Sequence, residues 1–205
     1  MIGVVAAQSD LAWVAEFFEL FKTPWELATP GRRYRVLLST TDVTDDHRAD
    51  LWLAYGAAEL SLDRRFGLRA ERLIGADTID WNGQTLPLYA DAARFSGDLD
   101  PDALRCGPHA CSYRRSCGHA TIRRFGYDLF AEVRHLLTHG QPKSRAAFPT
   151  LEFHIELQRT CLQEAGVPYV EIPPRPHGHS FVCCLTHDVD FFGVRRHRGD
   201  STLAG

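Results

Sequence analysis

The sequence lacks any long apolar run and any large excess of one charge. No window approaches the roughly 18 uninterrupted apolar residues that a membrane-spanning helix needs, so we expect no membrane span. The 205 residues carry 26 acidic and 23 basic side chains and a formal net charge of −3, whereas nucleic-acid-binding proteins are usually basic. With 44% hydrophobic and 24% charged residues, the composition predicts a globular protein without a nucleic-acid partner.

The N-terminal residues also lack the basic start of a secretory signal peptide. Residues 1–18 contain no Lys or Arg ahead of their apolar stretch, which Gln8, Ser9 and Asp10 interrupt early. We therefore expect a cytoplasmic protein. Because that compartment is reducing, we expect the six cysteines to be reduced thiols or metal ligands and not a disulfide framework.

Local sequence patterns predict a mixed α/β domain over residues 1–171. Apolar residues recur at helical spacing between residues 11 and 21 and again between residues 127 and 139, which predicts two helices. A third helix is expected to begin with Thr150 as its N-cap and to end at Gly166.

Other stretches of this domain predict strands. Residues 34–39 have the β-branched and aromatic content of a short buried strand. Asn82 and Gly83 lie between apolar neighbours and predict a hairpin turn. Residues 51–60 fit either a helix or a strand, because a short apolar run does not separate the two.

Residues 172–179 separate this domain from the C-terminal residues 180–205. Four of these eight residues are Pro or Gly, which predicts an extended linker. Residues 181–186 are an apolar run typical of a strand covered on both faces in a parallel sheet or barrel. Asp188 and Asp190 come after it, where such folds hold catalytic groups. One carboxylate of such a pair can hold a divalent cation while the other acts as a base, and a solvated turn is the alternative.

These last residues resemble a known family. Residues 184–191, CLTHDVDF, together with residues 193–197, are similar to the first motif of polysaccharide deacetylase-like (NodB-like) proteins in its Thr-His-Asp-Val-Asp variant. Residues 127–138 and 165–181 resemble the accessory N-terminal region that precedes the deacetylase domain in some members. The resemblance extends over residues 121–205 and is faint before them.

The resemblance implies a metal-dependent hydrolase that removes N-acetyl groups from a glycan. Residues 180–205 would hold the first strand of a truncated (β/α) barrel, with Asp188 as the general base and Asp190 as a ligand of a divalent metal, usually zinc. The His-x-x-x-His ligands of the family lie downstream of this motif and do not occur after it within the 205 residues, so we expect this chain by itself to be inactive. His135 and His139 have the same spacing but precede the motif, and we interpret them as one helical face.

A second cluster combines cysteine and histidine. Cys106, Cys111, Cys117 and His119 fall within fourteen residues and could surround a structural zinc ion. The spacings are longer than the two-residue knuckle of common zinc sites, so reduced thiols in a surface loop remain the alternative. This cluster supports the rival interpretation of the whole chain, a non-catalytic module that binds a glycan or a protein and holds a structural metal.

Overall fold

The computed structural model describes residues 1–44, 46–74, 78–81, 83–99, 103–172 and 176–185. The chain divides into two units, Met1–Ile172 and Pro173–Gly205, so the first unit ends on the first residue of the predicted linker. The first unit contains two sheets and several helices, which confirms the expected mixed α/β class. Within the described residues, no helix has the length and apolar character required to cross a membrane.

The main sheet of the first unit has six strands in the order β11-β12-β4-β3-β1-β2. Neighbouring strands are parallel except β11, which runs antiparallel to β12. In chain order these strands are β1 (Ile2–Val5), β2 (Trp25–Leu27), β3 (Arg33–Ser39), β4 (Arg48–Tyr55), β11 (Ser112–Cys117) and β12 (Ala120–Phe125).

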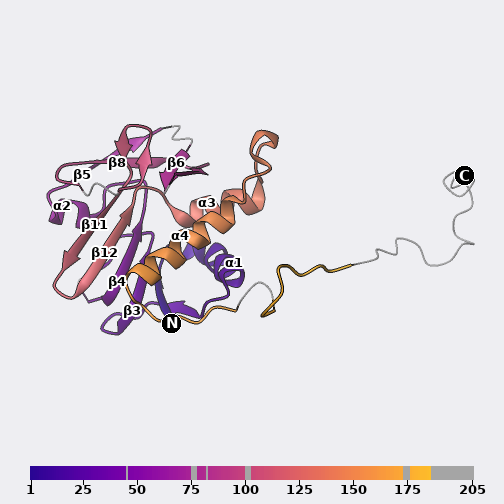
Figure 1. Cartoon of the computed structure of the whole chain (residues 1–205). Helices are drawn as coiled ribbons and strands as arrows, with labels where there is room; N and C mark the ends of the chain where they lie inside the picture. The colour runs from indigo at the N-terminus through magenta and orange to yellow at the C-terminus, as the bar shows by residue number, and fades with distance from the viewer. Residues whose placement is uncertain (45, 75–77, 82, 100–102, 173–175, 186–205) are drawn as a thin grey trace, which may run out of the picture. The chain divides into compact units, whose positions relative to one another are not determined.

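Three helices cover one face of this sheet, as Figure 1 shows. They are α1 (Leu11–Phe21), α3 (Leu129–Thr138) and α4 (Thr150–Glu164), and the short 3-10 turns Gln8–Asp10 and Lys143–Arg145 precede α1 and α4. Phe17 and Phe130 pack edge to face between α1 and α3. Because successive strand residues point to opposite faces, Leu51 and Leu53 of β4 join this core, while Trp52 and Ala54 point away from the helices.

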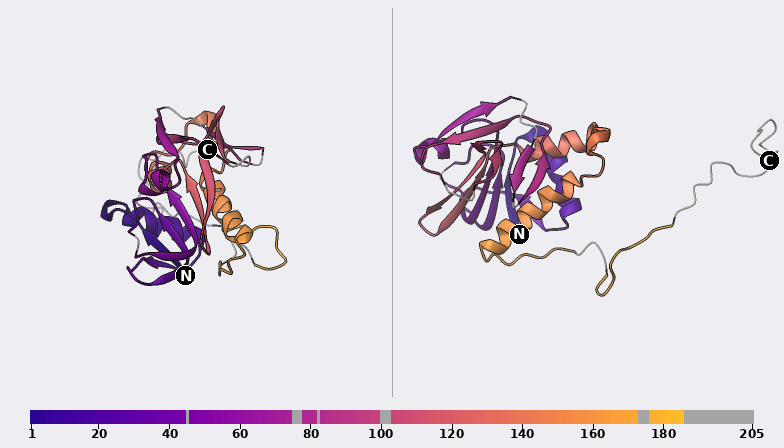
Figure 2. Two further views of the ribbon diagram at one scale, coloured as in Figure 1. Left: turned by 90° about the vertical axis from the view of Figure 1, so that its left-hand side faces the viewer. Right: turned by 45° about the horizontal axis from the view of Figure 1, so that its top comes forward.

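A second sheet and a short helix cover part of the opposite face (Figure 2). This sheet has the order β5-β8-β10-β9-β6-β7, and its paired strands are antiparallel. Its members, with the helix α2, are α2 (Ser61–Arg65), β5 (Arg69–Leu73), β6 (Thr78–Trp81), β7 (Gln84–Pro87), β8 (Ala92–Ser96), β9 (Arg105–Cys106) and β10 (His109–Ala110). Apolar side chains of α2 and β8, including Leu62 and Phe95, pack on Ile122 of the main sheet.

Most of the predicted elements are confirmed. Helices α1 and α3 occupy the expected stretches, and β3 contains residues 34–39. The ambiguous stretch 51–60 divides into the end of β4 and a loop. Strands β6 and β7 flank the predicted turn, in which Gly83 has a φ of 75° that favours glycine.

Two local expectations are corrected. Thr150 is the first residue of α4 and not its N-cap, which is Pro149, and the Thr150 hydroxyl donates a hydrogen bond to Gln141 instead. The predicted strand over residues 181–186 is not formed at residues 181–185, where Phe181 and Leu185 are 76% and 88% exposed. A buried strand needs neighbours that pair with its backbone and cover both faces, and the described pairings include none for these residues.

A fully buried ion pair joins the main sheet to helix α2. Arg124 of β12 and Asp63 of α2 have no exposed side-chain surface, and the Arg124 Nε donates to the Asp63 carboxylate at 3.2 Å. The same guanidinium donates to the backbone carbonyl oxygens of Gly56 and Ala58 at 2.7 Å each. The Tyr113 hydroxyl of β11 donates to Asp63 at 2.7 Å, and burial followed by Asp63 itself raises the pKa of this hydroxyl. Every charge in the cluster therefore has partners, as buried charges require.

Removal of one partner of this pair is expected to destabilise the fold strongly. In Asp63→Asn the Arg124 guanidinium stays buried without a counter-charge, so the free energy of unfolding should fall by about 3–5 kcal/mol, measured by urea denaturation. The control is Glu59→Gln, which breaks the exposed pair with Arg64 and should cost about 1 kcal/mol or less. Equal losses in the two variants would contradict a structural role for the buried pair.

Candidate functional site

A pocket of about 250 Å³ lies on the face of the main sheet that the helices leave uncovered, and we call it the Trp52 pocket. It lies near the amino ends of β3, β4 and β12, because Arg33, Arg48 and Ala120 are the first residues of these strands. Trp52, Leu37 and Ile122 also line it. The lining also includes five basic side chains, which are Arg33, His47, Arg48, Arg65 and His119.

Packing and a hydrogen bond position the apolar part of the Trp52 pocket. Leu37 and Ile122 are almost fully buried, so they form fixed walls. The half-buried indole of Trp52 donates from Nε1 to the Ser39 Oγ at 2.8 Å, which fixes its position on the sheet. A large aromatic side chain with its polar atom already paired presents mainly apolar surface to a ligand.

The basic side chains differ in how their charges are balanced. Arg33 pairs with Asp50, with the Nη2 at 2.5 Å from the carboxylate. Arg65 donates from Nη2 to the Cys117 Sγ at 3.3 Å, which is a contact with a thiol and not with a carboxylate. Arg48 is exposed, and in the described part of the chain no carboxylate pairs with it. The pocket therefore combines an apolar floor with an excess of positive charge.

The structure separates the four residues of the predicted Cys/His metal site. Cys106 and Cys111 are disulfide-bonded, with 5.9 Å between their Cα atoms, so the expectation of reduced thiols is wrong for this pair. Cys117 and His119 instead line the Trp52 pocket. The short strands β9 and β10 fold back on each other and bring Cys106 to Cys111, whereas Cys117 lies six residues further along extended chain, a span of roughly 20 Å.

The structure does not place the other predicted site residues together either. Asp188 and Asp190 lie outside the described residues. Among the described residues, no three His, Cys, Asp or Glu side chains gather in a way that could hold a metal ion. His135 and His139 stack on α3 with ring centroids 5.1 Å apart, and the Tyr89 ring stacks on His135 at 4.7 Å, which agrees with their interpretation as one helical face.

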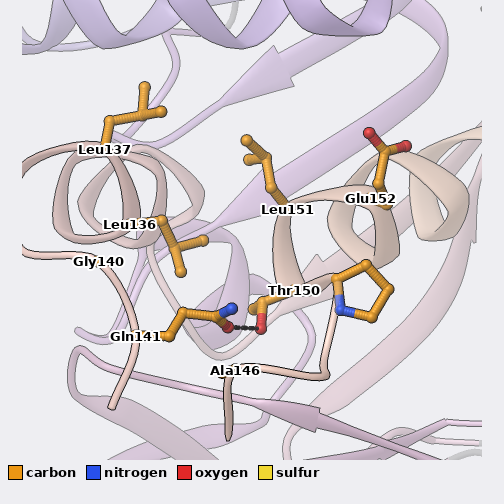
Figure 3. A pocket seen from close by; sticks show the side chains of 9 residues that line it. Leu136, Leu137, Gly140, Gln141, Ala146, Thr150, Leu151 and Glu152 are labelled. Carbon is orange, nitrogen blue, oxygen red and sulfur yellow. Dashed lines mark hydrogen bonds between the residues drawn. The ribbon is translucent and has the colours of Figure 1, made fainter. Parts of the chain in front are cut away.

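A second pocket, of about 430 Å³, lies between the end of α3 and the start of α4 (Figure 3). Leu136, Leu137 and Leu151 line it, and Figure 3 shows the hydrogen bond between Thr150 and Gln141 at its base. Gln141 also accepts from Tyr89 and donates to the backbone of Phe148, so its polar atoms have internal partners. Because these polar groups already have partners, this pocket has fewer groups that could orient a ligand than the Trp52 pocket has.

Sequence reasoning singled out Cys117 and His119, as part of a metal site, and missed the other residues that form the Trp52 pocket. Trp52 belongs to the stretch that fits either a helix or a strand, and the direction of its side chain depends on that choice. Arg33 and Arg48 are the first residues of adjacent parallel strands, paired in register. The sequence does contain a signal, a basic residue at the start of each apolar strand. This signal identifies a site only when the two strands are known to be neighbours.

Glu132 is a buried carboxyl group of α3 outside both pockets. Its two oxygen atoms accept from the backbone N–H groups of Tyr89 and Ala90 at 2.9 and 2.7 Å. Burial raises its pKa to about 7, and these hydrogen bonds oppose the shift. Because its acceptor atoms face the backbone of the loop after β7, Glu132 holds that loop against α3 and is not placed to act on a ligand.

The raised pKa of Glu132 predicts a pH-dependent stability. The folded protein favours the protonated form of the Glu132 carboxyl. The contribution of this group to the free energy of unfolding is therefore complete below the ordinary pKa of 4.5 and is lost as the pH rises through about 7. In Glu132→Gln the amide oxygen still accepts hydrogen bonds from the backbone, but the side chain does not titrate. The decrease in the free energy of unfolding between acidic and mildly alkaline pH should therefore be about 3 kcal/mol smaller than in the wild type, measured by urea unfolding. The exposed Glu16→Gln is the control, and an unchanged pH dependence in Glu132→Gln would contradict the prediction.

The disulfide predicts a defined thiol count. In protein unfolded without reductant, thiol titration should find four reactive groups per chain, from Cys117, Cys161, Cys183 and Cys184. Reduction should raise the count to six. Cys106→Ser should give five without reductant, because Cys111 loses its partner, whereas six thiols in the unreduced wild type would show that the bond is not formed.

The comparisons with solved structures include a distant likeness. No family model matches the chain, and no curated protein shows significant similarity to it. The E323A catalytic mutant of Gan42B, a GH42 beta-galactosidase from G. stearothermophilus, is similar to the chain with 12% sequence identity and a TM-score of 0.46. The alignment covers 78% of this chain and 26% of that one, so the chain spans about a quarter of the other protein's length.

Proposed function

We propose that the Met1–Ile172 unit is a glycan-binding accessory module of a polysaccharide deacetylase-like hydrolase. The observation that carries the binding role is the Trp52 pocket, in which an aromatic ring is surrounded by arginine side chains. The C–H face of a sugar ring stacks on an aromatic surface, and its hydroxyl groups accept hydrogen bonds from guanidinium groups. Trp52, Arg33 and Arg48 come from adjacent strands of one sheet and Arg65 from α2, so the backbone positions of these groups are fixed before a ligand binds.

The hydrolase part of the proposal rests on the motif in residues 184–191. Asp188 would accept a proton from the water that attacks the acetamido carbonyl, and Asp190 would help to hold a divalent metal, which the resemblance implies to be zinc. The metal would supply polarisation of the carbonyl and activation of water. Residues 172–179 would then connect the accessory module to the catalytic domain.

The alternative is a binding module without any catalytic partner. The observation that favours it is that the Trp52 pocket belongs entirely to the first unit and needs neither aspartate of the motif. A complete His-x-x-x-His motif encoded after codon 205 would support the hydrolase, whereas a coding sequence without it would leave the binding module.

Substitution of Asp188 tests the hydrolase directly. In the full-length protein, Asp188→Asn should lower acetate release from an N-acetylated oligosaccharide by roughly 10²-fold or more, because loss of a general base removes a contribution of that size. Asp190→Ala should lower the bound metal measured by elemental analysis. His139→Ala is the control, since His139 directly follows α3 as its C-cap and its substitution should change neither value. Full activity in Asp188→Asn would exclude the proposed mechanism.

Trp52→Phe tests the accessory role in the same protein. Loss of indole surface should raise the KM for a polymeric substrate severalfold and leave kcat unchanged, because the module contributes binding and not chemistry. An unchanged KM would remove the Trp52 pocket from the proposal without affecting the hydrolase part.

A further inference from the structure

We propose that the sugar bound in the Trp52 pocket is acidic, with its negative charge held by Arg48 and Arg65. This inference rests on the proposed glycan-binding function and adds the chemical class of the ligand. A carboxylate or a sulfate ester on the sugar would supply the same chemistry, a planar or tetrahedral group of oxygen acceptors. Guanidinium groups bind such oxyanions through paired, charge-assisted hydrogen bonds.

The balance of charge in the pocket is the first argument. Asp50 neutralises Arg33, whereas Arg65 contacts the Cys117 thiol and no described carboxylate pairs with Arg48. Two guanidinium charges therefore line a pocket of about 250 Å³ without acidic partners among the described residues. Like charges around a small pocket repel each other, and an anionic ligand would remove that repulsion.

The placement of the two arginines is the second argument. Arg48 begins β4, the same strand that carries Trp52. Arg65 is the last residue of α2, two residues after Asp63, which the buried pair with Arg124 fixes to the sheet. Both guanidinium groups thus come from fixed elements that border one pocket. Such an arrangement lowers the entropy cost of binding.

The size and surroundings of the pocket favour a sugar over a nucleic acid. Its volume of about 250 Å³ lies just below the usual range for ligand pockets, roughly 300–1,000 Å³, which suits one unit of a glycan. The chain has a formal net charge of −3, so it lacks the general positive field that attracts a nucleic-acid backbone. A local positive pocket on an acidic protein selects a ligand with a local negative charge.

Calorimetric titration of the 205-residue chain with matched tetrasaccharides tests the inference. The ligands are neutral tetra-N-acetylchitotetraose, its sulfated counterpart and tetragalacturonate, with a uridine tetranucleotide as a polyanion control. At least one acidic tetrasaccharide should bind roughly tenfold more tightly than the neutral one, and its affinity should fall as the NaCl concentration rises. The two acidic ligands distinguish a sulfate from a carboxylate.

Arg48→Gln is the decisive variant. It should weaken binding of the acidic tetrasaccharide by roughly tenfold and binding of the neutral one by a clearly smaller factor, because a guanidinium group binds an oxyanion more strongly than a sugar hydroxyl. Arg134→Gln is the matched control, because Arg134 is an exposed arginine on α3, which covers the other face of the sheet. Circular dichroism of both variants should match the wild type, since Arg48 is exposed.

Each other outcome overturns a distinct part of the argument. Equal affinity for neutral and acidic tetrasaccharides would overturn the charge inference and leave glycan binding in place. No binding of any tetrasaccharide would overturn both the inference and the proposed binding role, while acetate release by the full-length protein would still report on the hydrolase. The inference would also be overturned if the uridine tetranucleotide bound as tightly as the acidic sugars. The same holds if Arg48→Gln and Arg134→Gln lost equal affinity for the acidic tetrasaccharide.

Discussion

The arrangement of the main sheet's face opposite α1, α3 and α4 depends on the buried pair between Arg124 and Asp63. Arg124 comes from β12, Asp63 from α2, and the same cluster binds the loop after β4 and the Tyr113 hydroxyl of β11. A buried guanidinium needs all of these partners at once, because each missing hydrogen bond leaves a desolvated donor. The cluster therefore fixes where α2 lies on the sheet, and through α2 it places Arg65 beside the Trp52 pocket.

The two faces of the main sheet have different roles. Helices α1, α3 and α4 close one face with a continuous apolar core. On the other face, α2 and the second sheet cover the carboxyl ends of β4 and β12 around Ala54. Open α/β sheets usually bind ligands at those carboxyl ends. Here α2 and the second sheet cover that position around Ala54, whereas the Trp52 pocket lies at the amino ends of the strands.

Sequence patterns predicted the elements whose formation is governed by local spacing. Helices α1 and α3 follow from apolar periodicity, and the hairpin of β6 and β7 follows from its Asn-Gly turn. The disulfide was missed, because the reduced state was inferred from the expected cytoplasmic compartment and not from the turn that brings Cys106 to Cys111. The assignment of Asp188 and Asp190 stays a prediction, since both lie outside the described residues.

The α/β class, the main helices and the motif in residues 184–191 can be read from the sequence, because each depends on residues close together in the chain. Which side chains meet depends instead on how distant parts of the chain pack. Arg48, Arg65 and His119 share one pocket because β4 lies between β3 and β12 and because α2 is fixed over that face. Strand order and the choice of face result from long-range packing, and local sequence patterns do not contain that information.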